Sequence, residues 1–136
     1  MTSINLTREE ADQRSRMIEV HHYDVTLDLK YSDTHFLSTT KVSFTSREIG
    51  STFIDLRAEE VHEVRLNGNP LPTNSYNPTY GIPLSGLQVA DYTLEVTAKI
   101  PYSRTSEGLH RFVDPADDKV YLYTQFETAD AKRVFA

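Results

Sequence analysis

The residues best suited to chemistry lie near the end of the sequence, in the segment 120–127, which reads VYLYTQFE. Its side chains alternate as in a strand, so Tyr121, Tyr123, Gln125 and Glu127 would share one face. A carboxylate such as Glu127 can accept a charge-assisted hydrogen bond from an ammonium group, worth about 1.5–3 kcal/mol. The neighbouring Gln125 amide can both donate and accept. These two residues are therefore candidate binding residues, and the alternative interpretation is a solvated strand face.

The five histidines raise the question of a metal site. Residues 62–66, HEVRL, begin like the zinc-protease motif His-Glu-x-x-His, but Leu66 stands where the second histidine is needed. The surrounding pattern predicts a strand, in which residues four apart lie about 13 Å from each other, too far to share one ion. His21 and His22 are adjacent, so on a strand their rings would point to opposite faces. We therefore predict no metal site in this chain.

Other catalytic patterns are weak in this sequence. It contains no Gly-x-Ser-x-Gly motif and no phosphate-binding glycine loop. The paired carboxylates Glu59-Glu60 and Asp117-Asp118 fall in predicted turns, where acidic residues are common. We expect no catalytic residue here, and we expect the chain by itself to be inactive.

The elements that position the candidate residues are mostly strands. Thr7 and Glu10 have capping-box spacing, which predicts a helix over about residues 8–19 that is polar nearly all round. Alternating patterns predict strands at 23–31, 36–48, 51–57, 61–66, 70–72, 92–100, 108–113 and 119–127. Residues 73–90 are expected to be mostly loop with short strand fragments.

Two strands have faces that the pattern assigns to the protein interior. One face consists of Tyr23, Val25, Leu27, Leu29 and Tyr31. The other consists of Val120, Leu122, Thr124 and Phe126. Because apolar residues dominate both sets, we expect each strand to be half-buried.

Turn signals fix how the strands connect. Asn67-Gly68 between two apolar runs predicts a type I′ hairpin turn, because both central residues need positive φ. Residues 114–118 are expected to form the turn that pairs 108–113 with 119–127. The chain is therefore predicted to be a single all-β domain over 1–136, an antiparallel β-sandwich or saddle-shaped sheet over about 21–127 with a short N-terminal helix.

Composition narrows the class of partner. The 136 residues carry a net charge of −6 and no cysteine. An acidic chain lacks the basic patches that nucleic acids and anionic membranes require. No apolar run is long enough for a membrane span, and no secretory signal opens the sequence. We expect a cytoplasmic protein.

The apolar ending Val134-Phe135-Ala136 lacks the polar tail usual at a chain terminus. We interpret the sequence as one domain of a longer protein. Such a domain would expose apolar surface that a neighbouring domain normally covers.

Several motifs together resemble the N-terminal domain of the aminopeptidase N family, zinc metallopeptidases of the gluzincin type. The most specific is the Thr-Gln-x-Glu segment at 124–127, preceded by Gly-Leu-His-Arg-Phe at 108–112 and an acidic turn. Ala129-Asp130-Ala131 and Phe135 continue the match, and residues 23–29 resemble the first strand of the family. The resemblance covers nearly the whole chain.

The resemblance implies a function and a role for the candidate residues. The complete enzyme would remove single amino acids from the free N-terminus of peptides, with its zinc ligands in a catalytic domain outside this sequence. Glu127 would help bind the α-ammonium group of the substrate, and Gln125 would lie beside the pocket for the first side chain. The second hypothesis is a non-catalytic β-sandwich binding module, in which Tyr121 and Tyr123 form a stacking platform.

Overall fold

The computed structural model describes residues 8–77, 81–103, 108–125 and 131–136, with their side chains except those of 123–125 and 131. One α-helix, α1 (Arg8–Met17), precedes the strands in this part of the chain. The strands are β1 (Ile18–Asp28), β2 (His35–Ser46), β3 (Gly50–Ile54), β4 (Glu60–Leu66), β5 (Asn69–Pro70), β6 (Ile82–Leu87), β7 (Ala90–Pro101), β8 (Gly108–Val113) and β9 (Val120–Gln125). A short 3₁₀ helix, η1 (Ala131–Arg133), follows. The predicted all-β class with antiparallel strands and one short N-terminal helix is confirmed.

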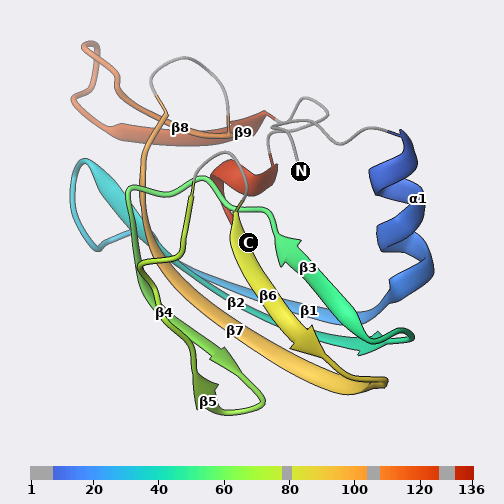
Figure 1. Cartoon of the computed structure of the whole chain (residues 1–136). Helices are drawn as coiled ribbons and strands as arrows, with labels where there is room; N and C mark the ends of the chain where they lie inside the picture. Colours follow the sequence, from blue (N-terminus) through green and yellow to red (C-terminus); the bar gives the residue numbers. More distant parts are fainter. Residues whose placement is uncertain (1–7, 78–80, 104–107, 126–130) are drawn as a thin grey trace.

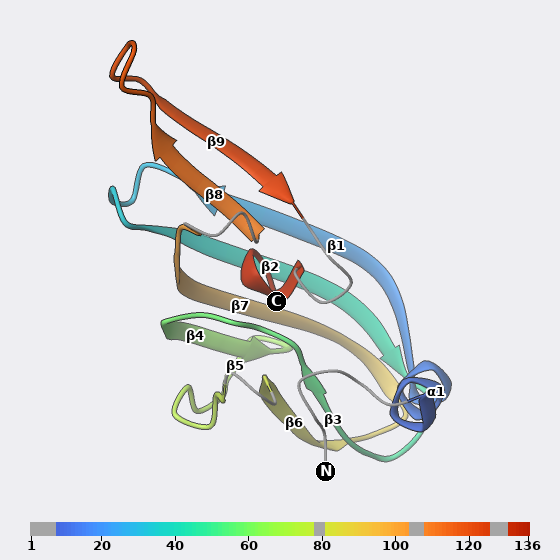
Figure 2. The ribbon, with the colours of Figure 1, turned by 90° about the horizontal axis from the view of Figure 1, so that it is seen from above.

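The strands form one large sheet and two ribbons. The large sheet has the order β1-β2-β7-β4-β5, and the ribbons are β3-β6 and β8-β9. The sheet is strongly curved, and β3-β6 lies against its inner side (Figure 1). Seen from above, β8-β9 lies at the end of the molecule far from α1 (Figure 2). The fold is thus a two-layer β structure extended by a terminal hairpin.

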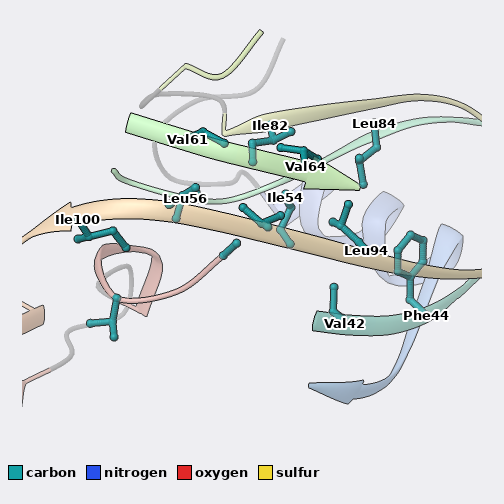
Figure 3. Packing of buried hydrophobic residues seen from close by; sticks show 14 of the residues in the cluster. Val42, Phe44, Ile54, Leu56, Val61, Val64, Ile82, Leu84, Leu94 and Ile100 are labelled. Atoms are coloured by element: carbon teal, nitrogen blue, oxygen red, sulfur yellow. The ribbon is translucent and has the colours of Figure 1, made fainter. Parts of the chain in front are cut away.

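The core lies between the curved sheet and the β3-β6 ribbon. Alternate residues of β7 are almost completely buried, with Leu94, Val96 and Ala98 each 1% exposed. Ile54 of β3 and Ile82 of β6 face the large sheet across this core (Figure 3). The alternation predicted for residues 92–100 is therefore confirmed, because one face of β7 packs inward and the other faces outward.

The turn at Asn67-Gly68 has the predicted conformation, with φ of 51° and 81°. It joins β4 to β5, whose register pairs Leu66 with Asn69. The Asn67 side chain accepts a hydrogen bond of 2.8 Å from the backbone N–H of Thr93, which attaches the turn to β7. Asparagine therefore supplies both the left-handed backbone and the anchoring acceptor.

The helix and the loop region differ in detail from the expectation. The helix predicted over 8–19 ends at Met17, because Ile18 already pairs with Ser46 of β2. The described part of 73–90 contains the strand β6, which pairs with β3. That pairing joins segments far apart in the sequence, so local turn residues could not indicate it. None of the helices in the described ranges is long and apolar enough to cross a membrane.

The interior assignment of the first strand is wrong at four of its five residues, whereas Leu27 is partly buried against the core. Tyr23 and Val25 remain 43% and 40% exposed, although both point to the inner side of the sheet. Leu29 and Tyr31 lie beyond the end of β1 and are also exposed. β1 is an edge strand of the large sheet, so it lacks the cover from both neighbours that a central strand such as β7 receives.

Candidate functional site

The hairpin β8-β9 carries the candidate binding residues. The two segments pair as predicted, and the register places Gly108 opposite Gln125 at one end and Val113 opposite Val120 at the other. Gln125 is the last residue of β9, and only its backbone belongs to the described atoms. Glu127 lies outside the described residues. The structure therefore places the strand end that leads to Glu127, but not the carboxylate.

The predicted acidic turn closes this hairpin. The Asp114 N–H donates to the Lys119 carbonyl at 2.9 Å, and the Asp118 N–H donates to the Asp114 carbonyl at 2.7 Å. The Asp114 carboxylate also accepts from the Ala116 N–H at 2.8 Å. Asp118 has φ of 57°, a left-handed conformation that aspartate tolerates better than most residues. These acidic residues thus help to form the turn, and Asp117-Asp118 lies in the turn where the sequence predicted it.

Gly108 fixes the other end of the hairpin. It has φ of 74°, and a Cβ built on it would lie 3.0 Å from Arg133 Cβ and 3.7 Å from Val134 Cγ2. Val134 itself is only 3% exposed. Because Gly108 is the partner of Gln125, this close approach holds this end of the hairpin against the last residue of η1 and the residue after it.

A second set of contacts attaches β8 to the large sheet. The Ser103 N–H donates to the Leu109 carbonyl at 2.7 Å, and the Arg111 N–H donates to the Ser103 carbonyl at 3.2 Å. The Arg111 guanidinium lies 5.9 Å from the centre of the Tyr102 ring and 3.5 Å from the Asp33 carboxylate. Burial raises the pKa of Tyr102, and this effect exceeds the opposing one of Arg111. The hairpin is therefore attached by the contact of Arg111 with the buried Tyr102 and by two backbone hydrogen bonds to Ser103.

The predicted core face of β9 is wrong at the two residues whose side chains the structure describes. Val120 is 48% exposed and Leu122 is 37% exposed. The other two residues of this face lie outside the described atoms, namely the Thr124 side chain and the whole of Phe126. Leu109, which is 6% exposed, anchors the hairpin instead. A two-stranded ribbon at the end of a sheet buries its base and leaves its tip in solvent, so alternation alone overestimates burial there.

The opposite face of the hairpin carries aromatic rings. Tyr121 stacks on Phe112 at 5.5 Å between ring centres, and His110 lies 5.9 Å from Phe112. The Tyr121 hydroxyl donates to an Asp117 oxygen at 2.6 Å. This hydrogen bond raises the pKa of Tyr121 and is the main cause that lowers the pKa of Asp117. Tyr121 shares this face with Gln125 by strand alternation.

Sequence reasoning included Gly108, Phe112 and Arg111 in the family motif but assigned none of them a role in this site. A glycine at the first position of a strand was an available signal, since strands disfavour glycine unless a bulge or a close approach requires it. The stacking of Phe112 on Tyr121 follows from the pairing of the two residues across the hairpin.

The described residues do not fit a zinc site. No three His, Asp or Glu side chains within the described ranges are arranged to hold a metal ion. His21 contacts the Thr45 hydroxyl at 2.6 Å, and His22 lies 3.3 Å from Asp24. His62 lies 3.7 Å from Glu60, and His35 contacts Glu59. His35 also contacts the Thr34 hydroxyl at 2.7 Å. Three of these four histidines thus lie beside one carboxylate each, and His21 contacts a hydroxyl.

Comparisons with known proteins identify relatives. No protein family model matches the chain. The chain is 49% identical over 139 aligned positions to aminopeptidase N of Streptomyces lividans, and the alignment covers all of this chain and 16% of that protein. Among solved structures, an aminopeptidase A of Legionella pneumophila in complex with aspartic acid matches with a TM-score of 0.66. That match covers 87% of this chain and 14% of the other at 19% identity, so it shows a shared fold.

The chain thus spans about a sixth of the curated relative that it matches. The resemblance inferred from the motifs of β8, β9 and the first strand is confirmed: over its whole length, this chain is related to aminopeptidase N.

Proposed function

We propose that this chain is the N-terminal β domain of a zinc-dependent aminopeptidase that removes single amino acids from the N-termini of peptides. In this proposal the end of β9 presents Gln125 and Glu127 to the substrate, and Glu127 binds the α-ammonium group. The chain alone is inactive, and the catalytic domain belongs to the same polypeptide. The protein acts in the cytoplasm, without nucleic-acid or membrane partners.

The observation that carries this proposal is the 49% identity to aminopeptidase N along the entire chain. The alignment includes the Thr-Gln-x-Glu segment, which is the most specific of the motifs. The β8-β9 register supports the proposal, since Gln125 ends a strand whose other end is fixed by a defined turn. A residue on such a strand has a better defined position than one on a free loop.

The chemistry of a carboxylate at position 127 suits an exopeptidase. The enzyme must distinguish a free amine from an internal or blocked amide. A desolvated carboxylate is paired by an ammonium group but left unpaired by an uncharged amide, so blocked substrates are rejected. The same contact holds the substrate end in register with the reacting bond.

Zinc has no fitting ligand set among the described residues of this chain. In the proposed full-length enzyme the ligands lie in the catalytic domain. The metal would polarise the substrate carbonyl and activate a water molecule there. The contribution of this chain is limited to binding and orienting the substrate.

The test uses the full-length protein and an unblocked alanyl or leucyl chromogenic amide. We expect turnover that a chelator abolishes and that an N-acetylated substrate does not support. Glu127→Ala should lower kcat/KM by roughly 10- to 150-fold, which corresponds to the loss of a charge-assisted hydrogen bond.

The matched control is Glu48→Ala, which also removes one carboxylate. Glu48 is exposed and follows β2 at the end of the sheet far from β8-β9 (Figure 1). We expect its kcat/KM to equal that of the wild type. If turnover is sensitive to the chelator but the two substitutions have equal effects, the aminopeptidase proposal stands. The proposed role of Glu127 in substrate binding would then be wrong.

The stacked pair Phe112 and Tyr121 favours a second candidate function, a non-catalytic binding module. The two rings are 42% and 39% exposed, which suits stacking against a sugar or a partner protein. Absence of turnover by the full-length protein, together with carbohydrate binding that Tyr121→Ala abolishes, would favour this candidate.

A further inference from the structure

The inner side of β1 forms an apolar surface that the described residues of this chain cover only in part. We define the β1 apolar face as Val20, Tyr23, Val25 and Leu27. In the antiparallel register these residues pair with Phe44, Val42, Thr40 and Ser38 of β2. Directly opposite residues of two strands point to the same side of a sheet. The β1 apolar face therefore continues the face of β2 that forms the core.

Burial falls abruptly from β2 to β1. Val42 and Phe44 are 3% and 4% exposed, whereas Tyr23 and Val20 beside them are 43% and 50% exposed. The inner layer thus covers the sheet up to β2 and stops there. Several adjacent apolar side chains left half-exposed on one strand mark an interaction surface rather than isolated surface residues.

The surface is shaped to accept a side chain. A hollow of about 60 Å³ opens beside it, lined by Val20, Tyr23, Phe44 and Phe53 among other residues. Arg14 stands at this hollow, with its guanidinium 4.1 Å from the centre of the Phe53 ring. Besides Arg14, Tyr23 and Thr52, the residues that line this hollow are all aliphatic or phenylalanine, so an apolar side chain is the ligand that it suits.

The last residues of the chain lie on this same side of the sheet. The Phe135 ring meets Tyr23 edge-on at 6.2 Å between ring centres. The Ala136 N–H donates to the Thr40 hydroxyl at 3.3 Å. Any residues that follow Ala136 in a longer polypeptide would therefore emerge beside the β1 apolar face.

We propose that the β1 apolar face is the docking surface for the remainder of the same aminopeptidase polypeptide. The occupant is an apolar segment that follows this chain, with one side chain in the hollow between Tyr23 and Phe44. The inference rests on the proposed function in one respect, that the chain is part of a longer aminopeptidase. The related aminopeptidase N is about six times as long as this chain, which leaves ample polypeptide for the purpose.

A second copy of the chain is a less suitable occupant. Each copy carries a net charge of −6, so two copies repel each other. Ala136 attaches the following segment at the surface itself, which gives that segment a high effective concentration there. A tethered partner therefore outcompetes a free one of similar chemistry.

The test measures thiol alkylation in the full-length protein with two neighbouring variants, Val25→Cys and Thr26→Cys. Val25 belongs to the β1 apolar face, and Thr26 is exposed on the opposite side of the same strand. Rates are read for the individual peptide by mass spectrometry, so other cysteines do not interfere. We expect the thiol from Val25→Cys to react at least tenfold more slowly than that from Thr26→Cys, at every protein concentration.

Two outcomes would overturn the inference. Similar rates for the two thiols would overturn it, because the face would then be open to solvent. Protection that disappears on dilution would also overturn it, in favour of a second copy. If Val25→Cys does not fold, Val20→Cys serves in its place, since Val20 is 50% exposed and belongs to the same face. The alkylation rate does not depend on catalysis. If the face is protected but the protein has no aminopeptidase activity, the proposed function is refuted and the docking surface is supported.

Discussion

Gly108 packs so closely against Arg133 that a Cβ at position 108 would lie 3.0 Å from the arginine Cβ. Gly108 also has φ of 74° and is the ladder partner of Gln125. The contact therefore links the end of β9 to the final segment of the chain. A change at this glycine should affect both the stability of the hairpin and the position of the candidate binding residues.

Gly108→Ala should destabilise the chain by about 2 kcal/mol or more. A left-handed conformation costs an L-residue roughly 1–2 kcal/mol, and the added methyl group must also displace Arg133. Urea unfolding measures the change. In the full-length protein the same substitution should lower kcat/KM, because the end of β9 shifts.

Gly86→Ala is the matched control for this glycine. Gly86 has φ of 69° but no heavy atom within 4 Å of an added Cβ. We expect it to show only the conformational cost of about 1–2 kcal/mol and no effect on kcat/KM. Equal destabilisation by both substitutions would mean that the contact with Arg133 does not restrain the hairpin.

The hydrogen bond from Tyr121 to Asp117 should be visible in a pH titration. It lowers the pKa of Asp117, so its contribution to stability is present above the ordinary pKa of about 4 and is lost as the pH falls through the lowered value. It raises the pKa of Tyr121, so the contribution is also lost as the pH rises through that raised value. Tyr121→Phe should move the pKa of Asp117 upward, as measured by carbon NMR of the carboxyl group. An unchanged titration would show that the turn backbone, not the phenol, sets this pKa.

The sequence predicted elements whose determinants are local. Asn67-Gly68 specifies its turn through positive φ, and the alternation of β7 specifies a buried and an exposed face. The hairpin β8-β9 was also predictable, since a short turn joins two alternating segments. In each case the residues that determine the element lie within the element or directly beside it.

The remaining features depend on distant segments. The pairing of Thr52 with Leu84 joins β3 to β6. The sequence of neither strand indicates which strand it pairs with. The exposure of Tyr23 follows from the edge position of β1 and not from its alternation. Gln125 and Glu127 stay predictions from the motif, because the Gln125 side chain and the whole of Glu127 lie outside the described atoms. The contact of Gly108 with Arg133 was not predictable, because the fold brings those two residues together.

Arg14 should attach α1 to the inner layer. It donates to the Phe53 carbonyl at 2.9 Å, and its guanidinium lies over the Phe53 ring. Arg14→Ala removes both contacts, worth about 1–2 kcal/mol together, and should accelerate amide hydrogen exchange throughout α1. Arg16→Ala, on an exposed position of the same helix, should leave the exchange rates unchanged. Equal acceleration by both variants would indicate that helix propensity, and not the Phe53 contact, holds α1.

Two neighbouring hydroxyls of β2 should respond to removal with opposite signs. Ser38 is 2% exposed, and its hydroxyl has no hydrogen-bond partner among the described residues. Thr40 is 1% exposed, and its hydroxyl accepts from the Ala136 N–H. An unpaired buried hydroxyl costs about 1–3 kcal/mol, so Ser38→Ala should raise the free energy of unfolding by about 1 kcal/mol.

Thr40→Val keeps the side-chain shape but removes the acceptor, leaving the buried Ala136 N–H without its partner. We expect a loss of about 1 kcal/mol in the free energy of unfolding, measured in urea alongside Ser38→Ala. The two residues lie on the same face of one strand, so general effects of polarity or volume would give both substitutions the same sign. Opposite signs would therefore show that the hydrogen bond to Ala136 stabilises the end of the chain against β2, beside the β1 apolar face.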